Sequence, residues 1–198
     1  MKVYGDWRSG NCYKVGLLLS LLERPYEWID VDVLGGETRT AQFRAKNPNA
    51  KIPVVELDDG RTLWESNSIL FYLAQGTTFL PQDPWLQAQV LQWQFFEQYS
   101  HEPYIAVARF INIYLGMPAE RKAEFEDKQV GGYQALDVME AQLHKHSFLV
   151  GDRFSVADIS LYGYTHVAGE GGFDLSRYPA IQAWIARIEA LPGYRAMG

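Results

Sequence analysis

A short stretch near the start of the chain combines residue types that can take part in thiol or anion chemistry. Ser9, Asn11 and Cys12 lie in Arg-Ser-Gly-Asn-Cys, residues 8–12, between a strand-like opening and a run with helical spacing. The unpaired N–H groups and the dipole of a helix N-terminus favour an anion such as a thiolate. The dipole alone contributes about 0.3–1 kcal/mol, so a side-chain donor such as Ser9 or Asn11 is needed as well. The same stretch also fits a simple capped helix start.

A second group of candidate residues lies between residues 51 and 66. In Lys51–Val55, Pro53 enters a predicted strand, so the Ile52–Pro53 bond is a candidate cis peptide. Because Pro53 has no N–H, the Ile52 backbone is exposed to pair with an extended ligand. Glu65 and Ser66 precede another predicted helix, where a carboxylate and a helix start suit an α-amino-acid group. Ser66 equally fits a plain N-cap.

The elements expected around these residues begin with an α/β half. The spacing of Val15, Leu18, Leu19 and Leu22 predicts a helix, which Pro25 ends. Strands are expected at residues 2–4, 26–33, 54–57 and 62–64, and further helices at 38–45 and 66–74. The turn at residues 58–60 makes the last two strands a hairpin. The order βαβαββα is typical of an α/β unit with a mixed sheet.

The second half is expected to be helical throughout. Residues 79–83 form a linker between a domain at 1–78 and a helical domain at 84–198. Helices are expected at residues 85–115, 120–146, 156–164 and 180–191. Ser155 and Asp158 have capping-box spacing, with Phe154 and Ile159 placed as a hydrophobic staple. We expect Asp158→Ala to lower stability by roughly 1 kcal/mol or more.

Composition and motif content disfavour several other functions. The net charge of −6 disfavours a nucleic-acid partner, which needs a basic face. The histidines, His101, His144, His146 and His166, have no zinc-protease spacing, so no metal is expected. No phosphate-binding glycine motif follows the first strand. A single cysteine, no signal-peptide pattern and no membrane-span pattern make the cytoplasm the expected location, with no membrane partner.

Taken in order, these segments resemble the cytosolic glutathione transferase superfamily. The first helical turn, the Asn47-Pro48 to Val54 segment and Glu65–Ile69 resemble its thioredoxin-like domain, and Gly151–Ile159 is similar to its second domain. The match covers essentially the whole chain, and the Ile-Pro, Glu-Ser and capping-box segments together are specific. The resemblance implies a thioredoxin-like βαβαββα domain followed by a C-terminal helical bundle, in a serine-type, theta-like bacterial member.

The resemblance also implies a glutathione site. Pro53 corresponds to the cis-proline, and the Ile52 backbone pairs with the cysteinyl part of glutathione. Glu65 and Ser66 hold the γ-glutamyl end, and Lys51 reaches the glycyl carboxylate. Glutathione is then a co-substrate, and no other cofactor is implied.

Three groups compete for the place beside the glutathione sulfur. Ser9 falls where serine-type classes keep the hydroxyl that stabilises the thiolate, so it ranks first, with Asn11 as helper or substitute. Some bacterial members use a cysteine on this turn, but Cys12 ranks third because a small buried cysteine is usually inert. Tyr4 invites comparison with the tyrosine of other classes, but it lies early and belongs to the strand.

The resemblance places the electrophile in a cleft between the domains. The candidates for its apolar walls are Trp7, Tyr99, Tyr104 and Phe110, although aromatics at helical spacing are more often core. Arg109 and His101 either line the same cleft or have structural roles.

The function expected from the resemblance is conjugation of glutathione to a small electrophile by a homodimer. Two alternatives remain open. The first is glutathione-dependent thiol–disulfide exchange or reductive halide removal, which would require Cys12. The second is a non-catalytic dimeric scaffold of the same fold.

Overall fold

Four short strands form one mixed sheet in the computed structural model, which describes all residues from 1 to 198. The sheet order is β2-β1-β3-β4, with β1 parallel to β2 and antiparallel to β3, and β3 antiparallel to β4. The strands are β1 (Lys2–Gly5), β2 (Glu27–Asp30), β3 (Val54–Glu56) and β4 (Thr62–Trp64). The predicted mixed sheet and its βαβαββα order are confirmed.

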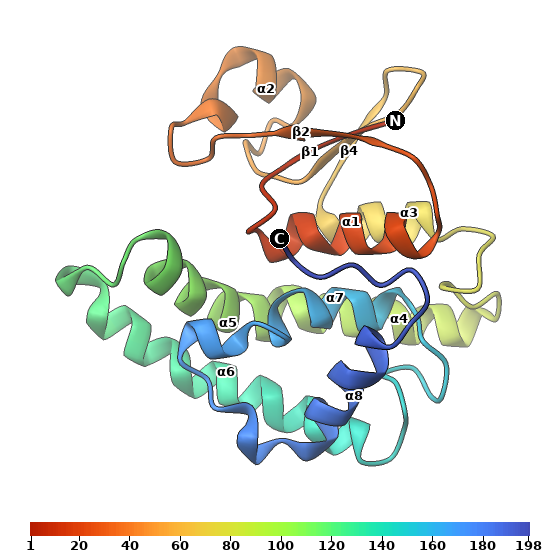
Figure 1. Ribbon diagram of the computed structural model, residues 1–198, viewed down its shortest axis with the longest axis vertical. Helices are drawn as coiled ribbons and strands as arrows, with labels where there is room; N and C mark the ends of the chain where they lie inside the picture. The colour runs from red at the N-terminus through yellow and green to blue at the C-terminus, as the bar shows by residue number, and fades with distance from the viewer. The chain divides into compact units, whose positions relative to one another are not determined.

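Alternate residues of the strands face different helices. Helices α1 (Gly10–Leu21) and α3 (Ser66–Leu73) lie on one side of the sheet, and α2 (Ala41–Lys46) lies on the other (Figure 1). Gly5 meets Cys12 of α1 so closely that a Cβ at Gly5 would lie 2.9 Å from the thiol sulfur. Tyr4 and Val54, which pair in register, pack instead with Phe43 of α2. This alternation is the period of two that a β-strand imposes.

Side-chain caps mark the starts of α1 and α2 but not of α3, where the suggested N-cap Ser66 is the first helical residue and Glu65 is an N-cap without a side-chain hydrogen bond. Ser9 and Thr40 are the N-caps of α1 and α2, and each side chain accepts a backbone N–H from the first turn. The helix expected at residues 38–45 is divided, because a 3₁₀ turn, Glu37–Arg39, precedes α2.

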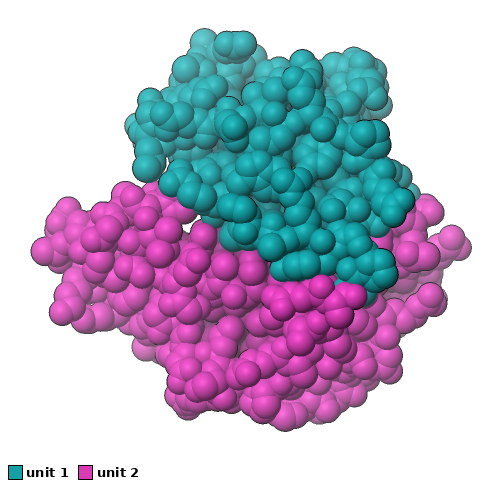
Figure 2. Space-filling model, viewed as in Figure 1, with its two compact units in different colours: residues 1–75, 191–198 teal, residues 76–190 magenta.

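The chain divides into two compact units whose bounds differ from the expected domains. Unit 1 comprises Met1–Gln75 together with Leu191–Gly198, and unit 2 comprises Gly76–Ala190 (Figure 2). The expected linker at residues 79–83 belongs to unit 2, where the Val156 N–H donates to the Phe79 carbonyl. The last segment belongs to unit 1 rather than to the helical domain, because its backbone is hydrogen-bonded to side chains of α1.

Unit 2 is built from helices, as the sequence predicts. Its α-helices are α4 (Pro84–Phe96), α5 (Glu102–Arg109), α6 (Lys122–Leu143), α7 (Val156–Thr165) and α8 (Pro179–Glu189). The expected long helix at 85–115 is one helical run whose register changes twice. The π-helical turns Glu97–His101 and Phe110–Tyr114 precede and follow α5. No helix combines the length and apolar character needed to cross a bilayer.

The predicted capping box at the start of α7 is present and is part of a larger hydrogen-bond network. Ser155 accepts the Ala157 N–H, and Asp158 accepts the Ser155 N–H at 2.9 Å. Asp158 also accepts the Leu149 N–H and the Trp184 indole N–H, both at 2.9 Å. Burial raises the pKa of the Asp158 carboxyl to about 6, against the opposing effect of these donors. One carboxylate therefore joins the start of α7 to the preceding loop and to α8.

Candidate functional site

The start of α1 carries the residues predicted to meet a thiolate. The Ser9 N–H donates to the Asp6 carbonyl at 2.9 Å, which closes a turn between β1 and the helix. Ser9 then caps α1, and its Oγ accepts the Cys12 N–H at a long 3.4 Å. A serine hydroxyl can rotate and donate to a ligand while its oxygen still accepts. The turn thus presents a helix N-terminus and a hydroxyl at one place.

Cys12 is buried and faces the sheet. Its side chain has 0% exposure and lies against Gly5 of β1. Burial raises the pKa of its thiol to about 12, which outweighs the opposing hydrogen bond from Ser9. Because the thiolate is the reactive form, a buried thiol with this pKa is a poor nucleophile at neutral pH.

Asn11 connects the starts of two helices. Its Oδ1 accepts the Lys14 ammonium at 2.7 Å and the Ser66 hydroxyl at 3.1 Å. Since both donors hold the carbonyl end of the amide, its Nδ2 end is directed away from them. The structure therefore brings together two of the predicted groups, Asn11 on α1 and Ser66 at the first position of α3.

Glu65 has an unusual backbone conformation just before α3. Its φ is 69° and its ψ is 112°, a region that side chains rarely adopt. Such strain is often found at binding sites, where the surrounding structure enforces it. The carboxylate is exposed and accepts the Asn49 side-chain amide at 3.4 Å. The strained turn sets the Glu65 carboxylate beside the helix N-terminus that begins at Ser66.

A short loop carries Lys51 and Pro53. The buried Asn47 organises it, because its Nδ2 donates to the Lys51 carbonyl at 2.7 Å and its Oδ1 accepts the Asn49 N–H at 2.9 Å. The Lys51 side chain is exposed, and the Ile52–Pro53 bond is cis. Asn49 also contacts Glu65, so the loop and the start of α3 are linked. Asn47 is not among the predicted site residues, because its contacts with the Lys51 carbonyl and the Asn49 N–H have no signal in the sequence.

Tyr4 lies on the α2 side of the sheet, where its side chain contacts Glu56 and Lys46. Its hydroxyl donates to Glu56 Oε2 at 2.9 Å, and the Lys46 ammonium binds the same oxygen and lies 4.8 Å from the Tyr4 ring centroid. Lys46 lowers the pKa of the Glu56 carboxyl, and the Tyr4 hydroxyl adds to this effect. Tyr4 is therefore a strand residue in a surface ion-pair cluster.

Trp7, a predicted wall of the electrophile site, is stacked inside unit 1. Its ring lies 3.8 Å from the Trp28 ring with an interplanar angle of 17°. The Arg195 guanidinium lies 4.2 Å from the Trp7 centroid. The indole is therefore enclosed between Trp28 and Arg195. Trp28 and Arg195 have no local sequence signal that would have linked them to Trp7.

The other predicted wall residues belong to unit 2 and have different surroundings. Tyr99, in the first π-helical turn, is 85% exposed. The Tyr104 ring packs on Gly131 of α6, and Phe110 stacks on Tyr114 with 5.1 Å between ring centroids. Their grouping into one electrophile site stays a prediction.

Arg109 and His101 have structural partners. Arg109 Nε donates to Glu170 Oε2 at 2.6 Å while its own side chain is 5% exposed. His101 Nε2 lies 2.9 Å from Thr165 Oγ1 in the interior of unit 2. These contacts favour the structural interpretation of both residues.

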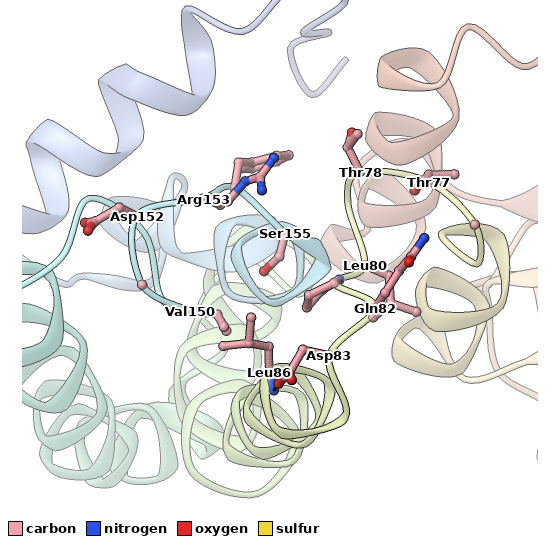
Figure 3. Close-up of a pocket in the computed structure, with 14 residues that line it drawn as sticks. Thr77, Thr78, Leu80, Gln82, Asp83, Leu86, Val150, Asp152, Arg153 and Ser155 are labelled. Atoms are coloured by element: carbon pink, nitrogen blue, oxygen red, sulfur yellow. Dashed lines mark hydrogen bonds between the residues drawn. The ribbon is translucent and has the colours of Figure 1, made fainter.

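Unit 2 also contains a cavity. Its volume is about 590 Å³, and it is lined by residues 76–78, 80–83, 86 and 150–155. Leu80, Leu86 and Val150 gather on one side, and Thr78 and Arg153 lie on the other (Figure 3). A volume of this size suits a small organic molecule. The cavity includes none of the residues predicted to bind glutathione.

Comparison with known proteins gives matches to both halves of the chain. The family model for the glutathione S-transferase N-terminal domain matches residues 8–75, and the model for the C-terminal domain of the same family matches residues 94–192. A crystal structure of a glutathione S-transferase from Pseudomonas fluorescens Pf-5 is 64% identical, with a TM-score of 0.98 and coverage of 99% of this chain and 98% of that chain.

More distant relatives differ in their stated activities. The disulfide-bond oxidoreductase YfcG of Escherichia coli K12 is 30% identical over 189 residues, which cover 92% of this chain and 87% of that protein. The glutathione transferase URE2P6 of Phanerochaete chrysosporium, solved in complex with oxidized glutathione, is 26% identical, with a TM-score of 0.87 and coverage of 97% and 91%. The relatives therefore include a transferase and an oxidoreductase.

Proposed function

The chain belongs to the glutathione S-transferase family, and on that premise we propose that it binds glutathione and activates the glutathione thiol as a thiolate at the start of α1. The thiolate sulfur then forms a bond to an electrophilic carbon, and either a leaving group departs with its bonding electrons or a double bond of the electrophile takes up an electron pair and then a proton. The observation that carries this proposal is the hydrogen bond between Ser66, at the start of α3 next to Glu65, and Asn11, on the helix that Ser9 caps. This bond joins a helix N-terminus suited to a thiolate with one suited to an amino acid.

The same residues suggest how the tripeptide is held. The Glu65 carboxylate accepts the α-ammonium of the γ-glutamyl residue, and the first N–H groups of α3 bind its carboxylate. The Ile52 backbone pairs with the cysteinyl residue. Lys51, which is exposed, binds the glycyl carboxylate.

Ser9 is the proposed donor to the thiolate, and Asn11 assists it. The hydroxyl proton of Ser9 stabilises the sulfur anion, and the helix dipole adds to the effect. The Lys14 and Ser66 contacts hold the Asn11 amide with Nδ2 on the opposite side, as a donor to the ligand requires. Rate enhancement then comes from a larger thiolate fraction and from proximity to the electrophile.

Disulfide exchange is the second candidate function, favoured by the relationship to a disulfide-bond oxidoreductase. A thiolate that attacks carbon also attacks the sulfur of a disulfide. The buried Cys12 is poorly suited to form a mixed disulfide, because its thiol pKa is about 12 and its sulfur is covered by β1. We therefore assign either reaction to the thiolate of bound glutathione rather than to Cys12.

Calorimetry and a thiolate titration test the proposal together. Wild type is expected to release heat on binding glutathione, and the bound thiol is expected to ionise below its ordinary pKa, as followed by thiolate absorbance. Ser9→Ala raises that pKa and lowers conjugation at neutral pH, whereas Cys12→Ala changes neither. Absence of binding heat and of competition by glutathione analogues would favour the non-catalytic scaffold. Loss of disulfide exchange in Cys12→Ser would restore Cys12 as the reactive group.

We expect a second copy of the chain to cover an aromatic face of unit 2. Trp85, Phe95 and Tyr99 lie at spacings that place them on one helical face, with exposures of 70%, 69% and 85%. Exposed aromatics at this density are typical of an interface. Light scattering should give a dimer mass for wild type and a monomer mass for Phe95→Glu. Val130→Glu, on the exposed face of α6, is the matched control, and a monomeric wild type would exclude the dimer.

A further inference from the structure

The segment Leu191–Gly198 lies along α1 and reaches the turn that carries Ser9. Figure 1 shows the end of the chain, in dark blue, beside α1. The Ser20 hydroxyl donates to the Gly193 carbonyl, and the Tyr13 hydroxyl donates to the Arg195 carbonyl, both at 2.7 Å. These two bonds fix the backbone of the segment along α1, so the position of Arg195 is determined by the helix that Ser9 caps.

The Arg195 side chain then covers Trp7. Its guanidinium lies 4.2 Å from the Trp7 centroid and its NH1 lies 3.4 Å from the Tyr26 hydroxyl. A guanidinium over an indole face is the most favourable cation–π geometry. Trp28 stacks on Trp7 at 3.8 Å, and the Tyr26 ring meets the edge of Trp28. Arg195 is thus the outer layer of a stack that rests on β2 and the residue before it.

Trp7 is also in close contact with α1. A Cβ at Gly16 would lie 2.8 Å from the Trp7 ring, so this contact requires glycine. Trp7 lies within the turn that the Ser9 N–H closes onto the Asp6 carbonyl. Movement of Trp7 therefore moves the turn that sets the direction of the Ser9 hydroxyl.

From these contacts we infer that Arg195 is a positioning residue for the thiolate site. It holds Trp7 against Trp28 and Gly16, and in this way holds the Ser9 turn in the geometry that receives the ligand sulfur. The inference rests on the proposed function for its effect on glutathione, but the effect on the turn itself is independent of any ligand.

Hydrogen exchange of the ligand-free protein tests the effect on the turn. In Arg195→Ala, the amides of residues 6–12 should exchange about two- to fivefold faster. The loss of one exposed cation–π contact changes the equilibrium for local opening by about this factor. Arg195→Lys should restore part of the protection, because an ammonium keeps the cation–π attraction but not the planar stacking. The matched control is Arg177→Ala, which removes the same charge from above Tyr133 in unit 2 at 6.0 Å. It should leave residues 6–12 unchanged.

The thiolate titration tests the effect on function. Arg195→Ala should raise the pKa of bound glutathione by about 0.3–0.7, which is the same two- to fivefold factor, and should lower kcat at neutral pH more than it raises KM. A residue that only stabilises the fold would lower Tm without moving this pKa.

A double-mutant cycle tests whether Arg195 acts on the Ser9 turn through Trp7. In a Trp7→Leu background, Arg195→Ala should have no further effect on exchange of residues 6–12. Unchanged exchange in Arg195→Ala, or additive effects of the two substitutions, would overturn the inference. Failure of the wild type to bind glutathione would contradict the proposed function instead, and the exchange result would still decide the role of Arg195.

Discussion

Removal of the Asp158 carboxylate should destabilise the protein far more than loss of an ordinary helix cap. Asp158 accepts hydrogen bonds from the Leu149 N–H, the Ser155 N–H and the Trp184 indole N–H, each at 2.9 Å. These residues are 1%, 3% and 0% exposed, so their donors have no access to water when the acceptor is lost. Asp158→Ala therefore leaves buried donors unsatisfied from three different parts of unit 2.

The expected loss of stability follows from the number of donors left without an acceptor. Each unsatisfied buried donor costs about 1–3 kcal/mol, so the loss of the acceptor for three donors should lower the free energy of unfolding of Asp158→Ala by about 3 kcal/mol or more at pH 7. That loss corresponds to a decrease in Tm of about 10 °C for a chain of this size. Ser155→Ala is the control for the cap alone, and it should cost about 1 kcal/mol.

The raised pKa of the Asp158 carboxyl should also make the stability of the protein fall as the pH rises. Burial raises the pKa of Asp158 from 3.8 to about 6 in the folded state, so between pH 4 and 6 the folded protein binds the proton more tightly than the unfolded chain. The contribution of Asp158 to stability is then fully present below pH 4 and falls by roughly 3 kcal/mol as the pH rises through 6. Asp158→Asn cannot titrate, so the difference in unfolding free energy between wild type and this variant should trace that decrease.

Urea unfolding of wild type, Asp158→Ala, Asp158→Asn and Ser155→Ala at pH values from 4 to 8 measures all of these quantities. If Asp158→Ala lost no more stability than Ser155→Ala, the donors would have other acceptors and the reasoning would be refuted. If the unfolding free energy of wild type rose with pH relative to that of Asp158→Asn, the predicted direction of the pH dependence would be refuted.

Two further substitutions test particular backbone positions. Glu65 has a φ of 69°, so Glu65→Gly should be about 1 kcal/mol more stable than Glu65→Ala by urea unfolding, while both bind glutathione equally weakly by calorimetry. Equal stability of the two variants would show that the turn relaxes. Gly131→Ala should cost about 1–3 kcal/mol in the same unfolding assay, because the new Cβ would lie 2.2 Å from the Tyr104 ring. A neutral or stabilising result would show that Tyr104 is free to move.

Local signals were sufficient to predict the elements of the fold. The hairpin was predicted from the Asp-Asp-Gly turn between two short strand patterns, and the start of α7 from its capping residue Ser155. A capped helix start was one of the two interpretations of residues 8–12, and Ser9 is the cap. These features depend on residues within a few positions of each other. The order of the elements was therefore predictable from the sequence.

Contacts between distant residues were not predictable in the same way. Ser66 was expected to meet only a ligand or its own backbone, but its hydroxyl donates to Asn11, 55 residues earlier. Asp158 was interpreted as a local cap, and neither Trp184 nor Leu149 has a sequence pattern that identifies it as a partner. The partner of a side chain across the fold depends on packing, which spacing along the chain does not encode.

The domain bound near residue 191 also depends on contacts between distant residues. The expected helical domain spans residues 84–198, yet Leu191–Gly198 packs in unit 1 through Tyr13 and Ser20. The segment has no periodicity of its own, so only its hydrogen bonds identify the unit to which it belongs.

The central claim, that glutathione supplies the reactive sulfur and the start of α1 holds it, is tested most directly by a crystal structure of the protein with glutathione. The account predicts that the sulfur lies within hydrogen-bond distance of Ser9 Oγ, with the γ-glutamyl group at Glu65 and the start of α3. A disulfide between the ligand and Cys12, or a ligand sulfur directed away from the start of α1, would contradict it.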